Sequence, residues 1–140
     1  MESMISVEEI VWAAGFVDGE GWIGIRPGNK GKNYHLDIAV GQVDIRPLLF
    51  LKEKFGGEVY LHRVNAARYP NRQTSYQWQA NGWVASDFLT FVLKYLRVKK
   101  EKAEQAIAFQ NTFKYRGRTT KLTCEQIDFV NRFNTKLAVA

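Results

Sequence analysis

Near the start of the chain, apolar residues recur at helical spacing. Ser6-Val7-Glu8-Glu9 has the form of a capping box, in which a serine and a glutamate satisfy the first backbone donors of a helix. The apolar residues that follow are one, three or four positions apart: Ile10, Val11, Ala14 and Val17. The pattern predicts a helix over about residues 7–17, ended by Gly19 and Gly21.

Beyond Gly21 the pattern changes to alternation, which is typical of strands with one buried face. Residues 22–26 and 34–42 alternate on either side of the turn sequence 27–31, so they predict a β-hairpin. In the second strand the inward positions are Leu36, Ile38 and Val40. The outward positions are His35, Asp37, Ala39 and Gly41.

A short helix should follow, capped by Asp44, with Pro47 in its first turn and Gly56-Gly57 at its end. Its expected apolar side is Leu48, Leu49, Leu51 and Phe55. Two more strands flank a polar loop over residues 63–74. Their inward residues are Val59 and Leu61 on one strand and Tyr76 and Trp78 on the other.

The remaining sequence predicts helices over residues 85–95 and 99–115, and a last helix opened by Thr123-Cys124-Glu125-Gln126. We assign the following aromatic residues to the core: Trp12, Trp78, Trp83, Phe88, Phe91, Phe109 and Phe113. The order of elements predicts an α+β fold in a single domain over residues 1–140. A four-stranded antiparallel sheet would have helices on one face and leave the other face open to a partner.

Composition limits the class of protein. A 46% apolar content is sufficient for a packed core, and no apolar run approaches the roughly 20 residues of a membrane helix. The N-terminus lacks the features of a signal peptide, so we expect a soluble, intracellular protein without a membrane partner. Cys124 is the only cysteine and we expect it to be buried; alone it excludes an internal disulfide and a cysteine-clustered zinc site.

Charge is distributed unevenly along the chain, whose net charge is +6. Residues 1–21 hold five carboxylates and no basic residue, whereas the rest holds all 20 basic residues and nine acidic ones. Such a basic segment is the electrostatic signature of a surface that binds a polyanion, and nucleic acid is the foremost candidate.

Ala13-Ala14-Gly15-Phe16-Val17-Asp18-Gly19-Glu20-Gly21 resembles the LAGLIDADG motif of homing endonucleases, and it ends the predicted first helix as in that family. Ala13 replaces the usual leucine and Phe16 an aliphatic residue. Glu20 replaces an aspartate but keeps the carboxylate that a metal requires. The resemblance implies the family's αββαββα fold with a saddle-shaped sheet, and it extends over the whole chain.

Because the motif occurs once, the resemblance implies a homodimer, in which both copies of Glu20 meet at the twofold axis. The implied interface residues are Ala13, Ala14, Gly15, Val17 and Asp18. Glu20, with Gly19 beside it, would hold Mg²⁺. Mn²⁺ should substitute, and Ca²⁺ should bind without cleavage. The expected reaction is hydrolysis of both strands of a long pseudo-palindromic DNA site, leaving short 3′ overhangs, and no small-molecule cofactor is expected.

Three polar residues match the family's pattern around the scissile phosphates, and the resemblance assigns them to catalysis beside Glu20: Gln42, Arg46 and Lys99. The position of Arg46 in this pattern is uncertain by one residue, and Lys100 can take the place of Lys99. His35 and His62 lack the spacing of metal ligands, which disfavours a zinc centre.

The outward face of the sheet would read DNA sequence in the major groove. The expected contacts on the strands are Trp22, Arg26, Asn33, His35, Asp37, Tyr60, His62, Ser75, Gln77 and Gln79. The expected contacts on the loops are Lys30, Lys32, Arg63, Arg68 and Arg72.

Two other functions are compatible with the same fold. One is a nucleic-acid binder that does not cleave, either an RNA-splicing maturase or a transcription regulator; the carboxylate of Glu20 argues against this loss of activity. The other is an adaptor domain whose open sheet binds protein, which the basic charge and the polar strands disfavour.

Overall fold

The computed structural model of the chain describes residues 4–28, 33–62, 67–68, 70, 74–112 and 124–135. Its helices are α1 (Val7–Glu20), α2 (Arg46–Phe55), α3 (Gly82–Val92), the short 3-10 helix η2 (Leu93–Tyr95), α4 (Lys100–Gln110) and α5 (Cys124–Thr135). Its strands are β1 (Gly21–Gly28), β2 (Asn33–Gln42), β3 (Glu58–His62) and β4 (Ser75–Asn81). The predicted order of helices and strands is confirmed.

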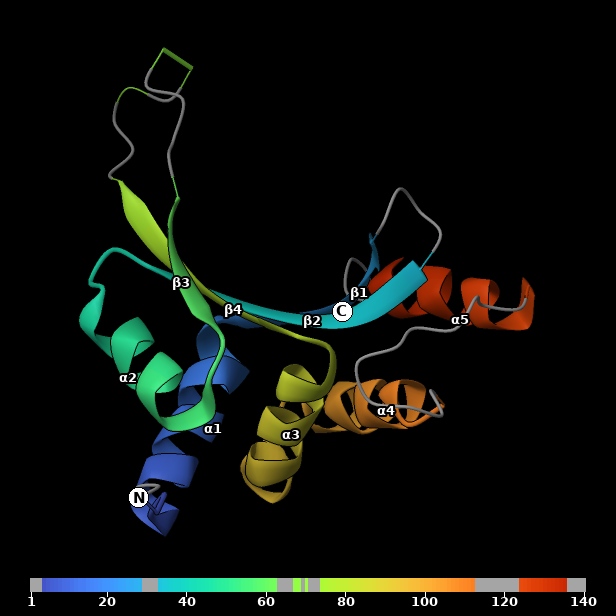
Figure 1. The fold of residues 1–140 in the computed structure, drawn as a ribbon, viewed down its shortest axis with the longest axis horizontal. Coiled ribbons are helices and arrows are strands. Elements are labelled where there is room, and N and C mark those ends of the chain that lie inside the picture. The colour runs from blue at the N-terminus through green and yellow to red at the C-terminus, as the bar shows by residue number, and fades with distance from the viewer. Residues whose placement is uncertain are drawn as a thin grey trace.

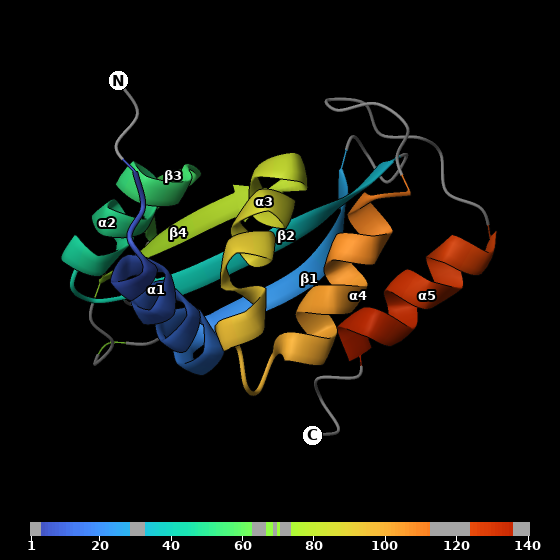
Figure 2. The same ribbon diagram turned by 90° about the horizontal axis from the view of Figure 1, so that it is seen from below.

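The four strands form one antiparallel sheet in the order β1-β2-β4-β3. The sheet is bowed, and α1, α2, α3 and α4 lie beneath it (Figure 1). Seen from below, they cover this face from α2 at one end to α4 at the other, where α5 lies beside α4 (Figure 2). Among the described residues no helix covers the opposite face. The fold is therefore the expected α+β arrangement with an open sheet.

The alternation of the strands sorts their side chains between the two faces. Ile23 and Ile25 of β1, Leu36 and Ile38 of β2, and Trp78 of β4 are buried on the helical side. The helices contribute the other half of this core, mainly Ala14, Val17, Leu48, Leu51, Phe88 and Leu89. Burial of this apolar layer is the main force that holds the helices to the sheet.

Helix α1 begins as predicted but ends later. Ser6 Oγ accepts a hydrogen bond from Glu9 N, and Glu9 Oε1 accepts one from Ser6 N, which completes the capping box. The helix continues through Gly19 to Glu20, three residues beyond the predicted end at Val17. Helical hydrogen bonds outweigh the low helix propensity of one glycine, so Gly19 does not stop the helix.

Several local predictions are corrected. The N-cap of α2 is Ile45; Asp44 lies one residue earlier, where its Oδ1 accepts from Arg46 N at 2.9 Å. Leu49 and Leu61 are exposed on α2 and β3, because α2 buries a narrow stripe and β3 is an edge strand. Further expected core residues are exposed: Trp12, Phe91 and Cys124.

Other boundaries shift by a few residues. Helix α3 begins at Gly82 rather than at residue 85, and η2 separates its end from α4. Strand β1 continues to Gly28, inside the predicted turn. Phe113, the end of the helix predicted over 99–115, and Thr123 of the last capping box lie outside the described residues. No helix in the described part is long and apolar enough to cross a bilayer.

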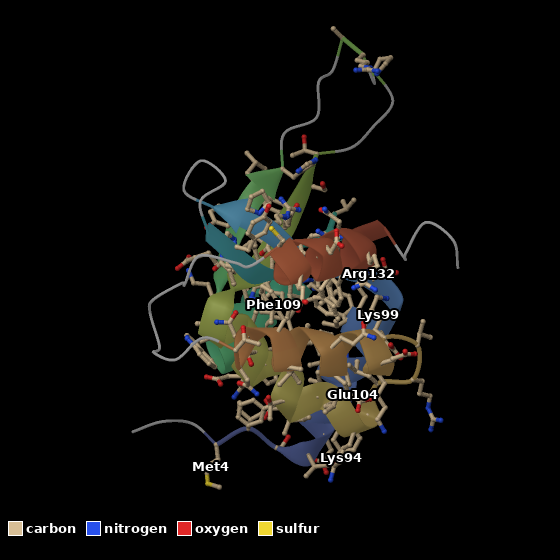
Figure 3. All side chains as sticks on the ribbon, turned by 90° about the vertical axis from the view of Figure 1, so that its right-hand side faces the viewer. Met4, Lys94, Lys99, Glu104, Phe109 and Arg132 are labelled. Atoms are coloured by element: carbon tan, nitrogen blue, oxygen red, sulfur yellow. The ribbon has the colours of Figure 1, made fainter. Side chains whose placement is uncertain are left out.

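Helix α5 protects the free edge of β1. Asn134 Oδ1 accepts from Ile25 N at 3.0 Å, and Asn134 Nδ2 donates to Ile25 O at 2.7 Å. This side-chain amide pairs with β1 as a neighbouring strand would, so it satisfies two backbone groups that would invite another strand. Lys102 of α4 donates to Phe133 O at 3.0 Å, and Phe109 lies between α4 and α5 (Figure 3).

The turn between α2 and β3 packs closely against β4, and substitution of a glycine there tests this contact. Gly57 has φ of +85°, and a Cβ there would lie 2.7 Å from Gln79 O and 2.8 Å from Trp78 Nε1. We therefore expect Gly57→Ala to lower the free energy of unfolding by about 2 kcal/mol, measured by urea denaturation. At Gly41 the nearest atom to an added Cβ, Tyr76 O, is 3.8 Å away. Gly41→Ala should change stability by less than about 0.5 kcal/mol, and equal losses in the two variants would contradict this account.

Candidate functional site

The end of α1 places a carboxylate at the start of the sheet. Glu20 is the last helical residue and is exposed, and Gly21 begins β1. Gly21 N donates to Val17 O, and a Cβ on Gly21 would lie 2.7 Å from the same oxygen. Glycine is therefore required for this close exit, although its φ is an ordinary −88°. The junction of helix and strand therefore fixes the backbone of Glu20 at the start of the sheet.

Asp18 connects this junction to α4. Its carboxylate accepts hydrogen bonds from the backbone nitrogens of Arg97, Val98 and Lys99, at 2.8, 3.0 and 2.8 Å. These donors precede α4 and have no partner within it, so Asp18 caps α4 from another helix. In return, Lys99 Nζ donates to Asp18 O. The ammonium of Lys99 thus lies at the end of α1, two residues from Glu20, where it also complements the helix dipole.

The pKa of Asp18 reflects this capping. Partial burial acts to raise the pKa of the carboxyl, but the three backbone donors and the charge of Lys99 outweigh burial, so its pKa is lowered. Asp18 is therefore ionised at neutral pH and contributes to the stability of this junction.

The other two expected catalytic residues differ in position. Gln42 ends β2, and the register pairs Gly21 with Val40, so Gln42 lies at the same end of the sheet as Glu20. Arg46 forms an ion pair with Asp44 instead, through Nε at 3.0 Å and Nη2 at 2.5 Å. This hydrogen-bonded pair lowers the pKa of Asp44 to about 2. Both side chains lie at the start of α2.

The open face carries the outward residues of all four strands. One transverse row follows from the register: Trp22 faces Ala39, Ala39 faces Gln79, and Gln79 faces Glu58. On one side of this row, Gln77 faces Tyr60 and, one row further, Ser75 faces His62. On its other side, Arg26 faces His35. The expected strand contacts with described side chains therefore share one face. The side chain of Asn33, and Lys30, Lys32, Arg63 and Arg72, lie outside the described residues, while Arg68 is exposed.

Asp37 differs from the expectation that it contacts DNA. It is on the open face, but its side chain is 0% exposed because its neighbours cover it. Arg26 Nε lies 3.0 Å from Asp37 Oδ2, and Gln79 Nε2 donates to both carboxylate oxygens at 3.0 Å. We name Trp22, Arg26, Asp37 and Gln79 the open-face cluster.

Within this cluster, Trp22 packs against Arg26 and lies over Gly24. The guanidinium carbon of Arg26 lies 4.6 Å from the centroid of the Trp22 ring. A Cβ at Gly24 would lie 2.1 Å from Cη2 of Trp22, so the indole lies directly over Gly24. Arg26 is thereby held between an aromatic face and a carboxylate. The role of Gly24 was not predicted, although glycine between two large outward residues, in Trp22-Ile23-Gly24-Ile25-Arg26, is the sequence signal of such a contact.

The expected dimer interface is also revised. Ala13, Ala14 and Val17 are fully buried in the core of the single chain, so they offer no surface to a second copy. Asp18 is engaged by the backbone before α4. Gly15 is exposed, as expected. The exposed stripe of α1 is Val11, Trp12, Gly15 and Gly19, at helical spacing.

Comparisons identify the fold. The homing endonuclease I-CvuI, solved in complex with its target in the presence of calcium, aligns with a TM-score of 0.62 over 91% of this chain and 95% of its own, at 16% identity. The LAGLIDADG homing endonuclease I-GzeII, solved with its DNA target, aligns with a TM-score of 0.66 over 96% of this chain and 45% of its own, also at 16% identity. The chain has the LAGLIDADG homing endonuclease fold.

The meganuclease I-SmaMI, solved bound to uncleaveable DNA, shares this LAGLIDADG fold. Its TM-score is 0.55, over 94% of this chain and 44% of its own, at 19% identity. No protein-family profile and no curated sequence matches the chain. At these low identities the likeness shows the fold alone, so the roles of Glu20 and the open-face cluster rest on their own geometry.

The Asp18 cap of this LAGLIDADG fold predicts a pH-dependent effect. Asp18→Asn should lower the free energy of unfolding by about 1 kcal/mol at pH 7, a modest value because solvent screens the site. Because the pKa of Asp18 is lowered by folding, its contribution is present above the usual pKa and is lost as pH falls through the lowered one. The difference between the two proteins should therefore shrink in urea denaturation from pH 7 towards pH 3.

Glu53→Gln, at an exposed carboxylate of α2, is the matched control and should give a difference close to zero throughout. A difference between wild type and Asp18→Asn that stays constant down to pH 3 would mean that the ionised carboxylate is not what stabilises the junction.

Proposed function

We propose that this chain is a site-specific DNA endonuclease of the LAGLIDADG type that hydrolyses both strands of its target with a divalent metal. The observation that carries the proposal is the exposed carboxylate of Glu20 at the end of α1. It lies at the edge of an open, polar sheet face, and the ammonium of Lys99 is hydrogen-bonded to Asp18 O, two residues earlier in the same helix. A carboxylate, a cation and a DNA-sized surface are the groups that phosphodiester hydrolysis needs in one place.

The donors at this junction fit a hard cation such as Mg²⁺. Glu20 supplies carboxylate oxygens, the ligands that a hard cation prefers. One chain does not supply enough ligands to hold a metal ion, however. Among the described residues no three His, Cys, Asp or Glu side chains cluster. Glu20 from a second copy and the phosphates of DNA would complete the set of ligands.

When bound, the metal would lower the pKa of a coordinated water and stabilise the developing phosphate charge. Glu20 would hold it at the junction. Lys99 would direct a positive charge towards the scissile phosphate, and its hydrogen bond to Asp18 O keeps the ammonium at this end of α1. Gln42, at the same end of the sheet, is available to orient the attacking water. Arg46 would have to leave Asp44 to take part.

Two copies would pack through the exposed stripe of α1. Gly15 and Gly19 are one helical turn apart, and no atom lies within 4 Å of a Cβ built on either. Helix backbones approach closely where glycines face each other, and the flanking Val11 and Trp12 are 44% and 43% exposed apolar groups that such contact would bury. The chain spans about half of I-GzeII and of I-SmaMI, so two copies together match the length of either one.

The endonuclease proposal is tested by Glu20→Gln. Cleavage of a randomised double-stranded DNA library in Mg²⁺ or Mn²⁺ should fall at least about 100-fold, since a neutral amide is a poor ligand for a hard cation. Binding to the selected DNA in Ca²⁺ should persist, because the substitution removes a negative charge from a surface that faces phosphates. The measurement is sequencing of cut ends beside a gel-shift assay.

Glu8→Gln, at an exposed carboxylate in the first turn of the same helix, should cleave like wild type. Sequence-selective binding by wild type without cuts in any metal would replace the endonuclease by a DNA-binding regulator of the same fold. Preferential binding of structured RNA would instead favour the maturase.

The dimer proposal is tested by Gly15→Leu. Sedimentation should show a monomer where wild type is a dimer, because leucine keeps the two helices apart. Thermal unfolding of the variant monomer should not be weakened, since the Cβ meets no atom of its own chain and leucine favours a helix over glycine by about 0.5–1 kcal/mol.

Glu104→Leu places the same side chain at an exposed position of α4 and should leave the dimer intact (Figure 3). A Gly15→Leu protein that still sediments as a dimer would place the interface elsewhere on the surface.

A further inference from the structure

Asp37 is an acidic group on a face that is proposed to lie against phosphates and bases. Isolated carboxylates are unfavourable in such a place, both because DNA repels them and because burial removes their hydration. Asp37 is nevertheless 0% exposed, with Arg26 on one side and Gln79 on the other. Both neighbours stand diagonally across a strand pair, at the distance that long side chains span.

The contact with Asp37 limits what Arg26 can do. Its Nε is engaged by the carboxylate at 3.0 Å, and the ring of Trp22 covers one face of its guanidinium. The two terminal Nη groups remain, side by side, on a side chain that is 51% exposed. This paired set of donors matches O6 and N7 of guanine, the two adjacent acceptors in the major groove.

The same carboxylate fixes the orientation of Gln79. A carboxylate only accepts hydrogen bonds, so the Gln79 amide must turn its nitrogen towards Asp37 and its oxygen away. Free glutamine can both donate and accept and so pairs with adenine in a bidentate way; here the donor is already used. The remaining oxygen accepts from the amino groups of adenine or cytosine, and it disfavours guanine and thymine, which offer acceptors at that position.

The geometry also limits the separation of the two bases. Arg26 Nε and Gln79 Nε2 each lie 3.0 Å from the same oxygen, Asp37 Oδ2, so they are at most about 6 Å apart. Successive base pairs rise by about 3.4 Å. The two anchored nitrogens are thus less than two base steps apart, so we expect the side chains to address one base pair or two neighbouring ones.

We propose that Asp37 is a positioning residue for sequence recognition: it fixes Arg26 as a pure donor and Gln79 as a pure acceptor, so that the open-face cluster reads a guanine together with an adjacent or paired amino base, adenine or cytosine. The inference rests on the proposed DNA-binding function and adds a specificity rule to it. Trp22 over Gly24 is the wall that keeps the guanidinium next to the carboxylate.

The test is selection from a randomised double-stranded DNA library in Ca²⁺ by wild type and four variants. Arg26→Ala should lose the preference for one guanine, and Gln79→Ala should lose the preference for an adenine or cytosine in the same or the next base pair. Asp37→Asn should weaken both preferences together, each by about tenfold or more. Glu104→Ala, at an exposed position of α4 on the helical side of the molecule, should change neither position.

A second readout separates positioning from a purely electrostatic or structural role. Asp37→Asn removes a negative charge, so its affinity for DNA of unrelated sequence should stay equal or rise while its discrimination falls. Loss of both affinities in parallel would overturn the proposal. Retention of both base preferences by a folded Asp37→Asn protein would overturn it as well.

If Asp37→Asn fails to fold, Arg26→Ala and Gln79→Ala still test the proposal. The bases that they lose must be a guanine and an amino base within two neighbouring pairs, and any other pair of bases contradicts the inference. Absence of any selected sequence with wild type would reject the DNA-recognition function itself, an outcome distinct from a wild-type site that Asp37→Asn reads unchanged.

Discussion

The passage from α1 into β1 is the constraint on which the candidate site depends. Gly21 N donates to Val17 O, and a side chain on Gly21 would collide with that oxygen, so the chain turns from helix to strand without an intervening loop. The turn buries Val17 on the helical side of the sheet and leaves Glu20 exposed at the sheet's edge. Asp18 then ties the same turn to the residues before α4, which brings Lys99 to it. One backbone junction therefore brings Glu20 and the ammonium of Lys99 to the same end of α1.

The open face shows how a polar surface can be ordered before its partner arrives. Side chains on an exposed sheet usually sample several rotamers and lose that freedom on binding. Arg26 is restrained by Asp37 and by the Trp22 ring, and Gln79 is restrained by the same carboxylate. A buried acidic residue on a surface proposed to bind DNA thus serves to preorganise its neighbours, at the expense of some attraction for phosphate.

A single chain of this fold is incomplete for the proposed chemistry. Its described residues contain no cluster of three metal-ligating side chains, and the stripe of α1 with Gly15 and Gly19 remains uncovered. The uncovered stripe lies on α1, the helix that also carries Glu20. Longer proteins such as I-GzeII, of which this chain matches 45%, offer the length of two such units in one chain. Symmetry between two copies would supply the same arrangement with half the sequence.

Local patterns in the sequence determined the elements and the inner face of the sheet. The capping box at Ser6 and the alternation of Leu36, Ile38 and Val40 report local hydrogen bonding and burial, which depend on nearest neighbours along the chain. The motif also located Glu20 at the end of its helix, although local propensity ended that helix too early. These features were predictable because short-range physics is enough to specify them.

Only the tertiary structure decided which polar and small residues are exposed and which are buried or engaged by neighbouring groups. Ala14 and Gly15 are both small, but packing buries the first against the core and exposes the second. Asp37 alternates as an outward residue, yet Arg26 and Gln79 reach it from two different strands and cover it. Asp18 meets its three backbone donors about 80 residues away along the chain. Such contacts depend on strand register and helix packing, which are set by the whole core and leave no periodic signal in the sequence.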